Sequence, residues 1–404
     1  MQSEKKAPRI TALLKVIMII SGTWRLPLGT SKFTENCYFL YSILAQVSIF
    51  LLWIGTLLNG LTAIKTYDFE KVFEGIGYAI IILLLLYKIF ISQTQKIKDL
   101  IVQCESEHEK TYQEEPEEVK ILVEANVQVL NVILYFSFLI TLFAAFVLYW
   151  TGISIYLEYR NYNSTVEKPL TIPMWCPFDH NRYYGIAFFI NFYMVVIGCN
   201  YSILVQILFF TLVTHAIIQL KSLGILAKNF HRYCEIDNSQ SGCVQNESVI
   251  TMLRHICFKH KSIISYVDLF NTSMQNVLLL EFLLNSLNIG FLIVRLLLPN
   301  QQFRVKIFVG IYGNVEIIRL FLTAWHANEV QFQSLALSDA LYASNWYEQS
   351  EKAKKIIQII MMRSRKPLNI SVGPFFAMTL DSAISTMKAA YSYVTLITTM
   401  ASKK

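Results

Sequence analysis

Long stretches without a charged residue constrain this chain more than any other feature of its sequence. Residues 36–64, 125–157 and 183–220 contain no Asp, Glu, Lys or Arg, and these runs are 29, 33 and 38 residues long. A helix needs about 20 apolar residues to cross the hydrocarbon core of a bilayer. Charged residues make up only 16% of the whole chain, against about 25% in soluble proteins. The sequence therefore predicts a helical protein that crosses a membrane several times.

Four further stretches are apolar but interrupted by charges, at residues 72–91, 267–298, 303–329 and 375–402. The first of them has Glu74 and Lys88 near its ends, where both side chains can snorkel to an interface. Together with the three uncharged runs, these stretches predict seven transmembrane spans. The expected fold class is all-α, a seven-transmembrane helical membrane protein.

Several of the predicted helices are longer than a bilayer is thick. Residues 119–156 favour one continuous helix, and residues 183–233 and 246–298 contain no proline. Since a helix rises about 1.5 Å per residue, the excess must project into water, where we expect the extensions to pack into a helical domain. Residues 10–20 are apolar but interrupted by Lys15, which favours a short amphipathic helix at the membrane surface over a signal peptide.

Basic residues and cysteines bear on the direction in which the chain crosses the membrane. With an intracellular N-terminus, 22 of the 35 Lys and Arg residues fall in inner segments and 8 in outer segments. This count favours that orientation, although the density of basic residues is similar on the two sides. Only Cys176 would then lie in an outer loop, whereas the reverse orientation would expose four cysteines to an oxidising space. We expect an intracellular N-terminus and an extracellular C-terminus.

Motifs of common enzymes are absent from the sequence. It contains no G-x-x-x-x-G-K-[ST] phosphate loop, no H-E-x-x-H and no C-x-x-C. We therefore expect neither an enzyme nor a bound metal or cofactor. The net charge of +7 is modest, and the basic residues lie between apolar runs, which argues against nucleic acid as a partner.

Aromatic side chains concentrate in the predicted outer halves of the spans. Such a cluster, with a few hydroxyl groups, is typical of a pocket for a small apolar ligand. The alternative is an interfacial belt of aromatic residues that face lipid or a neighbouring helix. The candidate ligand-binding residues are Phe73, Tyr78, Phe146, Trp150, Phe189, Tyr193 and Tyr312.

The last span carries many hydroxyl groups. Ser385, Ser392, Leu396 and Thr399 fall on one stripe of the predicted helix, which fits either a water-filled pore with one apolar constriction or a tight packing interface. Lys388 lies in mid-span and must face water or pair with an acid. In the preceding span, Glu316 and Arg319 have the i,i+3 spacing of an ion pair.

The end of the chain resembles a known family. Residues 386–397, TMKAAYSYVTLI, are similar to the closing signature of the insect odorant receptors. Residues 342–347, YASNWY, resemble the segment that leads into the seventh helix of that family, and residues 22–27, GTWRLP, resemble its G-x-W-P region with the proline displaced. His260, followed by Ile263 and Ile264, is similar to the opening of its fifth helix. The chain is thus identified as a member of this family.

The resemblance implies a function and partners. Members are odorant-gated, non-selective cation channels with an intracellular N-terminus, in which a tuning subunit assembles with the odorant receptor co-receptor into a heterotetramer. A small volatile odorant would bind in the outer half of the bundle, within the plasma membrane of olfactory sensory neurons and in contact with lipid. The pore would be lined by Ser392, Leu396 and Thr399, with the gate near Leu396. Because this chain lacks the co-receptor's extended second cytoplasmic loop, it resembles a tuning subunit.

The same resemblance divides the chain into four parts. Residues 1–34 would be a cytoplasmic segment with an interfacial helix, and residues 35–330 would form helices one to six with their cytoplasmic extensions. Residues 331–374 would hold the cytoplasmic anchor and the first part of helix seven, about 346–362. Residues 375–404 would be the pore-lining second part.

Other classes remain open. A gustatory receptor-type channel is close to this family. A G-protein-coupled receptor would have a D-R-Y triplet and an N-P-x-x-Y motif, neither of which occurs. A transporter usually shows two related halves, and we see no such internal repeat.

Overall fold

The computed structural model describes residues 10–24, 31–65, 69–161, 168–234, 245–297 and 303–402. The described helices are α1 (Ala12–Ile20), α2 (Lys32–Lys65), α3 (Phe69–Ser92), α4 (Gln95–Glu114), α5 (Glu117–Tyr159), α6 (Tyr184–Lys228), α8 (Gln245–Leu297), α9 (Phe303–Tyr342), the 3₁₀ turn η1 (Trp346–Glu348), α10 (Glu351–Ser364) and α11 (Leu380–Ser402). Two short strands, β1 (Ser371–Val372) and β2 (Phe376–Ala377), form an antiparallel hairpin. The fold is all-helical apart from this hairpin.

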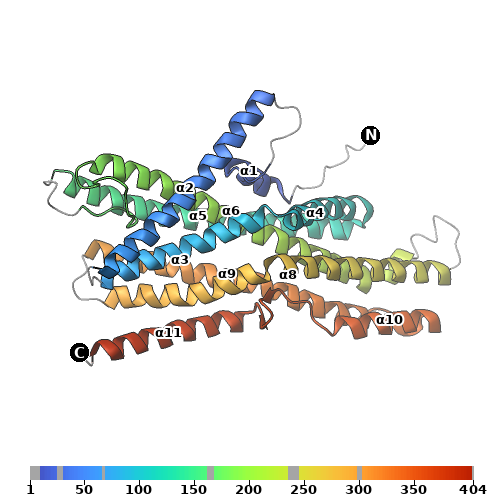
Figure 1. Cartoon of the computed structure of the whole chain (residues 1–404). Helices are drawn as coiled ribbons and strands as arrows, with labels where there is room; N and C mark the ends of the chain where they lie inside the picture. The colour runs from blue at the N-terminus through green and yellow to red at the C-terminus, as the bar shows by residue number, and fades with distance from the viewer. Residues whose placement is uncertain are drawn as a thin grey trace.

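The helices α2, α3, α5, α6, α8, α9 and α11 run side by side (Figure 1). The end of α2, the loop between α5 and α6, the end of α8 and the end of α11 lie at one end of the molecule, whereas α1, α4 and α10 lie towards the other. Each of the seven predicted stretches thus coincides with one of these helices. Among the described residues, only the helices α2, α3, α5, α6 and α8 are long and apolar enough to qualify as spans by hydropathy alone. The polar side chains of α9 and α11 explain why these two helices do not.

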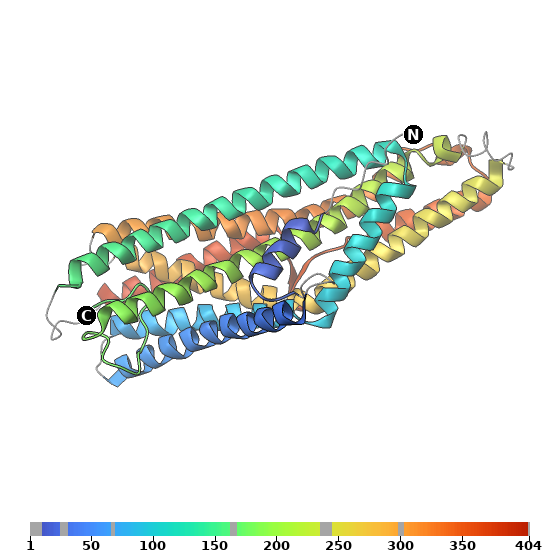
Figure 2. The ribbon, with the colours of Figure 1, turned by 90° about the horizontal axis from the view of Figure 1, so that it is seen from above.

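The helix α6 forms the centre of the bundle. In its most apolar 18-residue stretch 89% of the residues are buried, whereas the corresponding value for α5 is 11%. Both helices are apolar all round, a pattern that fits burial in protein or in lipid equally well. Figure 2 shows α6 lying between α2 and α5. Much of the α5 surface is therefore uncovered within the single chain.

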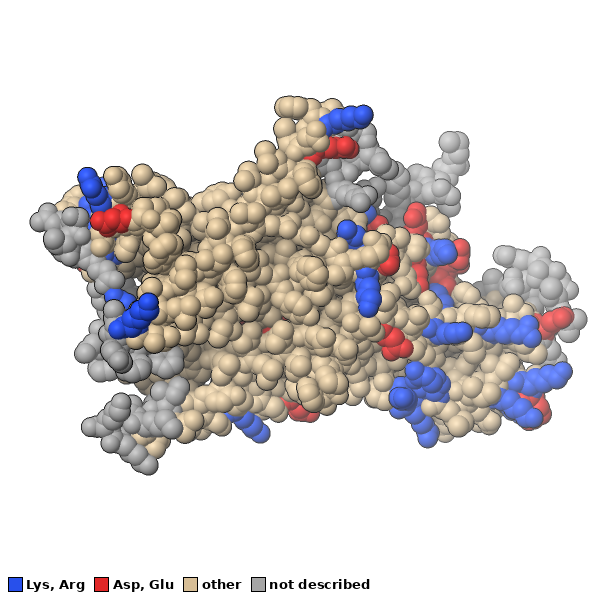
Figure 3. All heavy atoms as spheres, in the orientation of Figure 1, with Lys and Arg blue, Asp and Glu red and all other residues tan. Residues whose placement is uncertain are grey.

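A broad zone of the surface carries almost no charged side chains. On the face shown in Figure 3, blue and red atoms gather at the two ends, and the zone between them is almost entirely tan. A lipid-covered band requires such a surface because a charge at the bilayer centre costs about 2.5–3.5 kcal/mol even on insertion scales. The surface thus agrees with a membrane-spanning bundle.

The extensions of the long helices pack together, as expected. The helices α4 and α10 lie against the ends of α6, α8 and α9 that project beyond the uncharged zone, and we call this assembly the extension bundle. Its core contains Phe210, Tyr266 and Phe270, all almost fully buried. The Tyr266 hydroxyl donates to the carbonyl oxygen of Leu212 at 3.0 Å, so that α8 is fixed to α6 by a polar contact as well as by packing.

A half-buried carboxylate joins three helices of the extension bundle. Glu107 of α4 accepts hydrogen bonds from Gln103 at 2.9 Å and from Ser262 of α8 at 2.7 Å, and it lies 3.3 Å from Nε2 of His215 on α6. Burial acts to raise the pKa of Glu107, but the hydrogen bonds from His215, Gln103 and Ser262 outweigh it and lower the pKa to about 2. The ionised form is therefore the one that the folded chain stabilises.

Glu107→Gln is expected to lower the stability of the purified protein at pH 7 by about 1–2 kcal/mol, less than the full equivalent of a fall in pKa from 4.5 to about 2, because solvent screens the partly exposed carboxylate. Because the folded-state pKa lies below the unfolded value, the contribution is complete above pH 4.5 and is lost as the pH falls towards 2. The thermal midpoints of wild type and variant should therefore converge on acidification. Glu109→Gln, at an exposed position of the same helix, is the control. A difference between wild type and Glu107→Gln that does not change with pH would contradict this account.

The short N-terminal helix is present as predicted. In α1 the side chains of Leu14 and Met18 are fully buried against the rest of the chain, whereas Val16 and Ile20 are exposed. The helix is thus one-sided in its packing, as an amphipathic helix would be. Its expected place at the membrane surface stays a prediction.

The second half of the seventh span begins later than the sequence indicated. We expected the span to start at residue 375, but residues 371–377 pair as the hairpin and α11 starts at Leu380. The turn needs Gly373, whose φ of +59° is left-handed and whose added Cβ would come within 2.9 Å of Leu279. Asn271 of α8 fixes the segment that leads into the hairpin. Its side-chain nitrogen donates to the carbonyl oxygen of Asn369 at 2.8 Å, and its side-chain oxygen accepts from the backbone nitrogen of Ser371 at 2.9 Å.

Candidate ligand cavity and pore helix

An internal cavity of about 560 Å³ lies among α2, α3, α5, α6, α8 and α9. Most of its walls are aliphatic, with side chains such as Ile49, Ile81, Leu148 and Leu292. Ligand pockets in proteins usually have volumes of roughly 300–1,000 Å³ and mostly apolar walls. In size and chemistry the cavity can hold a small apolar molecule.

Small residues create the space. The α5 wall contains Ala144 and Ala145, and the α6 wall contains Gly198, Cys199 and Ser202. A Cβ atom added at Gly198 would meet only the Cδ1 atom of Ile49, at an ordinary 3.7 Å. Because these side chains end close to the helix backbone, neighbouring helices leave a gap where larger residues would close it.

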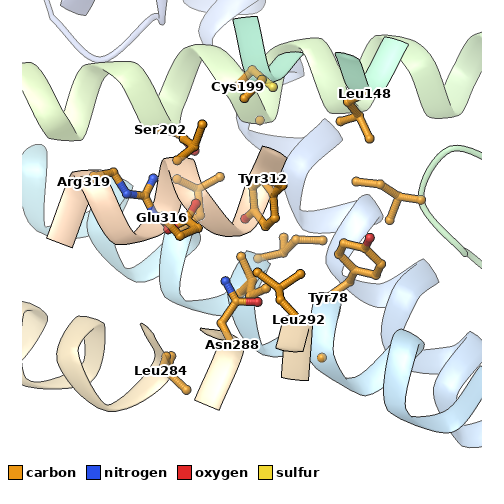
Figure 4. Close-up of a pocket in the computed structure, with 18 of the residues that line it drawn as sticks. Tyr78, Leu148, Cys199, Ser202, Leu284, Asn288, Leu292, Tyr312, Glu316 and Arg319 are labelled. Atoms are coloured by element: carbon orange, nitrogen blue, oxygen red, sulfur yellow. Dashed lines mark hydrogen bonds and ion pairs between the residues drawn. The ribbon is translucent and has the colours of Figure 1, made fainter. Parts of the chain in front are cut away.

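Two of the predicted ligand-binding residues line the cavity. Tyr78 comes from α3 and Tyr312 from α9. Figure 4 shows the ring of Tyr312 near Glu316 and the ring of Tyr78 at the end of the cavity that also holds Leu148. Sequence reasoning thus identified two aromatic side chains on opposite walls of one space.

Four of the predicted aromatic residues are not among those that line the cavity. Phe146, Trp150, Phe189 and Tyr193 have exposed fractions of 61%, 66%, 66% and 50%. The predicted i,i+4 contact between Phe146 and Trp150 is present, with ring centroids 6.3 Å apart, but both rings point outwards. The spacing correctly placed each pair on one face, although that face fits the interfacial belt better than the pocket. The side chain of Phe73 lies outside the described part of the structure.

One end of the cavity is polar. Glu316 and Arg319 form the predicted ion pair on α9, and Glu316 is almost completely buried. A second ion pair connects α3 to α8, with Nζ of Lys88 2.8 Å from a carboxylate oxygen of Glu281. The expectation that Lys88 snorkels to an interface is therefore wrong, since an acid on a neighbouring helix neutralises it inside the bundle.

The candidate pore residues lie on the uncovered face of α11. Ser392, Leu396 and Thr399 are exposed in this chain, whereas Ala390 and Val394 are buried on the opposite side of the helix, which packs against α8 and α9. Lys388 is exposed as well. The hydroxyl stripe is thus not the surface through which α11 packs within its own chain.

The helix α8 contacts both the cavity and α11. Asn288 and Leu292 of α8 line the cavity, and Gly290 between them faces α11, where an added Cβ would lie 3.3 Å from the carbonyl oxygen of Ala390. The helix α8 thus borders the cavity on one side and packs closely against α11 on another.

Sequence reasoning missed the polar and small residues of the cavity wall. Asn288 lies in the predicted span of α8 close to two other polar residues, Asn285 and Ser286, so that the sequence did not distinguish it from them. Gly198 and Ser202 lie on one face of α6, and no sequence pattern separates them from small residues that merely tighten helix packing. Only the arrangement of neighbouring helices shows that they border an open space.

The bundle of long apolar helices, with a cavity among them, defines the class of polytopic helical membrane proteins. The family model described as 7tm Odorant receptor matches residues 68–391, so the chain belongs to the odorant receptor family. This confirms the resemblance noted in the sequence.

Individual relatives agree with this assignment. The chain is 28% identical over 214 residues to Odorant receptor 10 of Aedes albopictus, an alignment that covers 53% of this chain and 55% of the relative. The chain thus matches about half the length of that curated relative. The structure of the insect olfactory receptor OR5 from Machilis hrabei superimposes with a TM-score of 0.79 at 18% identity, covering 95% of this chain and 96% of the other. The structure of the same receptor in complex with eugenol superimposes with a TM-score of 0.79 at 17% identity, covering 96% of this chain and 97% of the other. These structures establish a shared fold.

Proposed function

We propose that this chain is the tuning subunit of an odorant-gated, non-selective cation channel. The observation that carries the proposal is the largely apolar cavity among the helices, whose α8 wall also packs against α11. Membership of the odorant receptor family supports it. An ordinary odorant receptor among the relatives supports a tuning role rather than that of the co-receptor.

The ligand is a small, volatile, largely apolar molecule bound in the cavity. Tyr78 and Tyr312 are the aromatic contacts that we assign to it, because both line the space. The eugenol complex of the structural relative supports a ligand of this size. We assign Phe146, Trp150, Phe189 and Tyr193 to the lipid-facing surface.

Ligand binding opens a pore formed by α11 helices of neighbouring subunits. Four subunits, drawn from this chain and the odorant receptor co-receptor, surround the path, and the uncovered face of α11 with Ser392, Leu396 and Thr399 lines it. A ligand can favour the open state only by binding it more tightly than the closed state. The contact between Gly290 and Ala390 transmits that difference from the cavity to the pore helix.

The extension bundle is the cytoplasmic anchor in this proposal. The N-terminus then lies inside the cell, the C-terminus outside, and the receptor occupies the plasma membrane of olfactory sensory neurons. Charged residues at the end of the molecule that holds α4 and α10 support an aqueous location for that end. An epitope tag at residue 1 should be accessible only after cells are permeabilised.

Current recordings test the proposal. Cells that express this chain with the co-receptor should respond to some members of a panel of neutral volatiles, and cells that express either subunit alone provide the comparison. The currents should not depend on a coupling-ion gradient, which separates a channel from a transporter. Robust surface expression together with the co-receptor, but no current in response to any volatile of a broad panel, would contradict the proposal.

Leu396→Ser is expected to raise the current that flows without odorant. Leu396 is the apolar residue of the hydroxyl stripe, and its side chain is 56% exposed in the single chain. Replacing the apolar constriction of a pore by a hydroxyl makes the closed state easier to wet. Unliganded current relative to the odorant-evoked maximum is the measurement, and Ile384→Ser, at an exposed position three turns away on α11, is the control. Unchanged leak and unchanged ion selectivity in Leu396→Ser would remove Leu396 from the pore.

A further inference from the structure

The polar end of the cavity is built from three helices. Ser202 comes from α6, Asn288 from α8, and Glu316 with Arg319 from α9, and all four residues line the space. Figure 4 shows Ser202, Glu316 and Arg319 on the side of the cavity away from Tyr78 and Leu148, and Asn288 beyond Glu316, next to Leu292. The cavity therefore has an apolar body and one polar terminus.

Two side chains at this terminus have unused hydrogen-bonding capacity. Neither the hydroxyl of Ser202 nor the amide of Asn288 makes a hydrogen bond to any residue that the structure describes. Gln206, which also lines the cavity, instead donates to Thr323 at 3.2 Å. A polar group that faces an apolar cavity without a partner carries a desolvation cost, which a bound molecule with a matching group removes.

Hydrogen-bond donors are available at the polar terminus. The side chain of Glu316 is only 4% exposed and its carboxylate is paired with Arg319, whereas 34% of the Arg319 side chain remains accessible. The polar groups that a ligand can meet at this end are the Arg319 guanidinium, the Asn288 amide and the Ser202 hydroxyl, and the Ser137 hydroxyl on the α5 wall also has no partner among the described residues. Arg319 only donates, and the others can donate or accept. This set is suited to a hydrogen-bond acceptor.

Charge at the polar terminus is already balanced. Glu316 neutralises Arg319, and Lys88 neutralises Glu281. A carboxylate or an ammonium group placed there would be an additional unpaired charge in a low-dielectric site, which is costly. Arg295 lines the cavity two turns further along α8 than Asn288, at a distance from this cluster. The terminus thus favours a neutral group.

From this arrangement we propose that the cavity selects neutral molecules that carry one hydrogen-bond acceptor, such as a ketone, aldehyde or ester oxygen, on an apolar body. The acceptor oxygen lies at the polar terminus, where it meets the Asn288 amide or the Ser202 hydroxyl, and the apolar body extends towards Tyr78. This inference rests on the proposed function only in taking the cavity as the ligand site. Asn288 and Ser202 are its specificity-determining residues.

The experiment measures binding rather than current. The purified full-length chain is titrated with pairs of compounds that differ only in C=O against C=CH₂, namely acetophenone with α-methylstyrene and octan-2-one with 2-methyloct-1-ene. Benzoate and octanoate represent charged heads. Affinities are obtained from the rise of the thermal unfolding midpoint with ligand concentration.

The ketone of each pair should bind about 10-fold more tightly than its hydrocarbon isostere, and the carboxylates should bind more weakly than the ketones. Asn288→Leu should reduce the ratio within each pair to near 1 while leaving hydrocarbon binding intact, and Ser202→Ala should reduce it partly. Asn200→Leu, the same substitution at an exposed position of α6, should keep the wild-type ratio.

Equal affinities within the pairs, no ketone binding, or an unchanged ratio in both Asn288→Leu and Ser202→Ala would overturn the proposal. Because no current is read, the two proposals fail separately. Selective ketone binding without odorant-evoked current would count against the channel function alone. Odorant-evoked current without discrimination within the pairs would count against the polar terminus alone.

Discussion

Arg319→Ala is expected to destabilise the folded chain by about 3–5 kcal/mol, the usual cost of removing one partner from a buried ion pair. The substitution leaves the carboxylate of Glu316, whose side chain is 4% exposed, without its cation in the middle of the bundle. We therefore expect little protein at the cell surface and a strongly lowered thermal midpoint for what can be purified.

The double variant Glu316→Leu/Arg319→Met should recover most of the loss, because replacing both charges by apolar groups of similar volume is often neutral or stabilising. Surface labelling and thermal unfolding in detergent measure both variants. The pair between Lys88 and Glu281 remains intact in each of them. If Arg319→Ala folds as well as wild type, or if the double variant is no better than the single one, the pair does not stabilise the bundle as the structure indicates.

Gly198→Leu should raise the odorant concentration needed for half-maximal response about 10- to 100-fold. The position is on the cavity wall, and a Cβ atom there meets nothing closer than 3.7 Å. The added side chain can therefore enter the cavity without disturbing the fold, and the ligand must compete with it for space. Overpacking costs of 1–3 kcal/mol correspond to a change in affinity of about this size.

Gly224→Leu is the matched control for this experiment. It lies on the same helix, and an added Cβ meets no atom within 4 Å, but Gly224 is not among the residues that line the cavity. The control should respond like wild type. Dose–response curves of both variants, corrected for surface expression, give the answer. An unaltered curve for Gly198→Leu would place the ligand elsewhere.

Much of the fold could be predicted because transfer into a membrane depends on local composition. The uncharged runs at residues 36–64, 125–157 and 183–220 correspond to α2, α5 and α6, and the absence of proline predicted the length of α8. The ion pair between Glu316 and Arg319 followed from spacing on one helix. Ion pairs between different helices could not be predicted in this way, as the pairing of Lys88 with Glu281 demonstrates.

The candidate site was predictable only in part. Tyr78 and Tyr312 were identified as aromatic residues of the outer halves, and both line the cavity. Phe146 and Trp150 satisfied the same criterion and face outwards. A period of 3.6 residues tells which side chains share a face of a helix, but it does not tell what that face contacts.

The sequence by itself thus determined the number, length and approximate limits of the membrane helices, because the cost of placing charge in hydrocarbon depends on each segment alone. The tertiary structure decided which apolar faces meet protein, lipid or an empty space. Lipid tails and aliphatic side chains are equally apolar, so hydrophobicity does not distinguish these surroundings. The cavity, its polar terminus at Asn288 and the contact of Gly290 with α11 arise only from how closely neighbouring helices can approach.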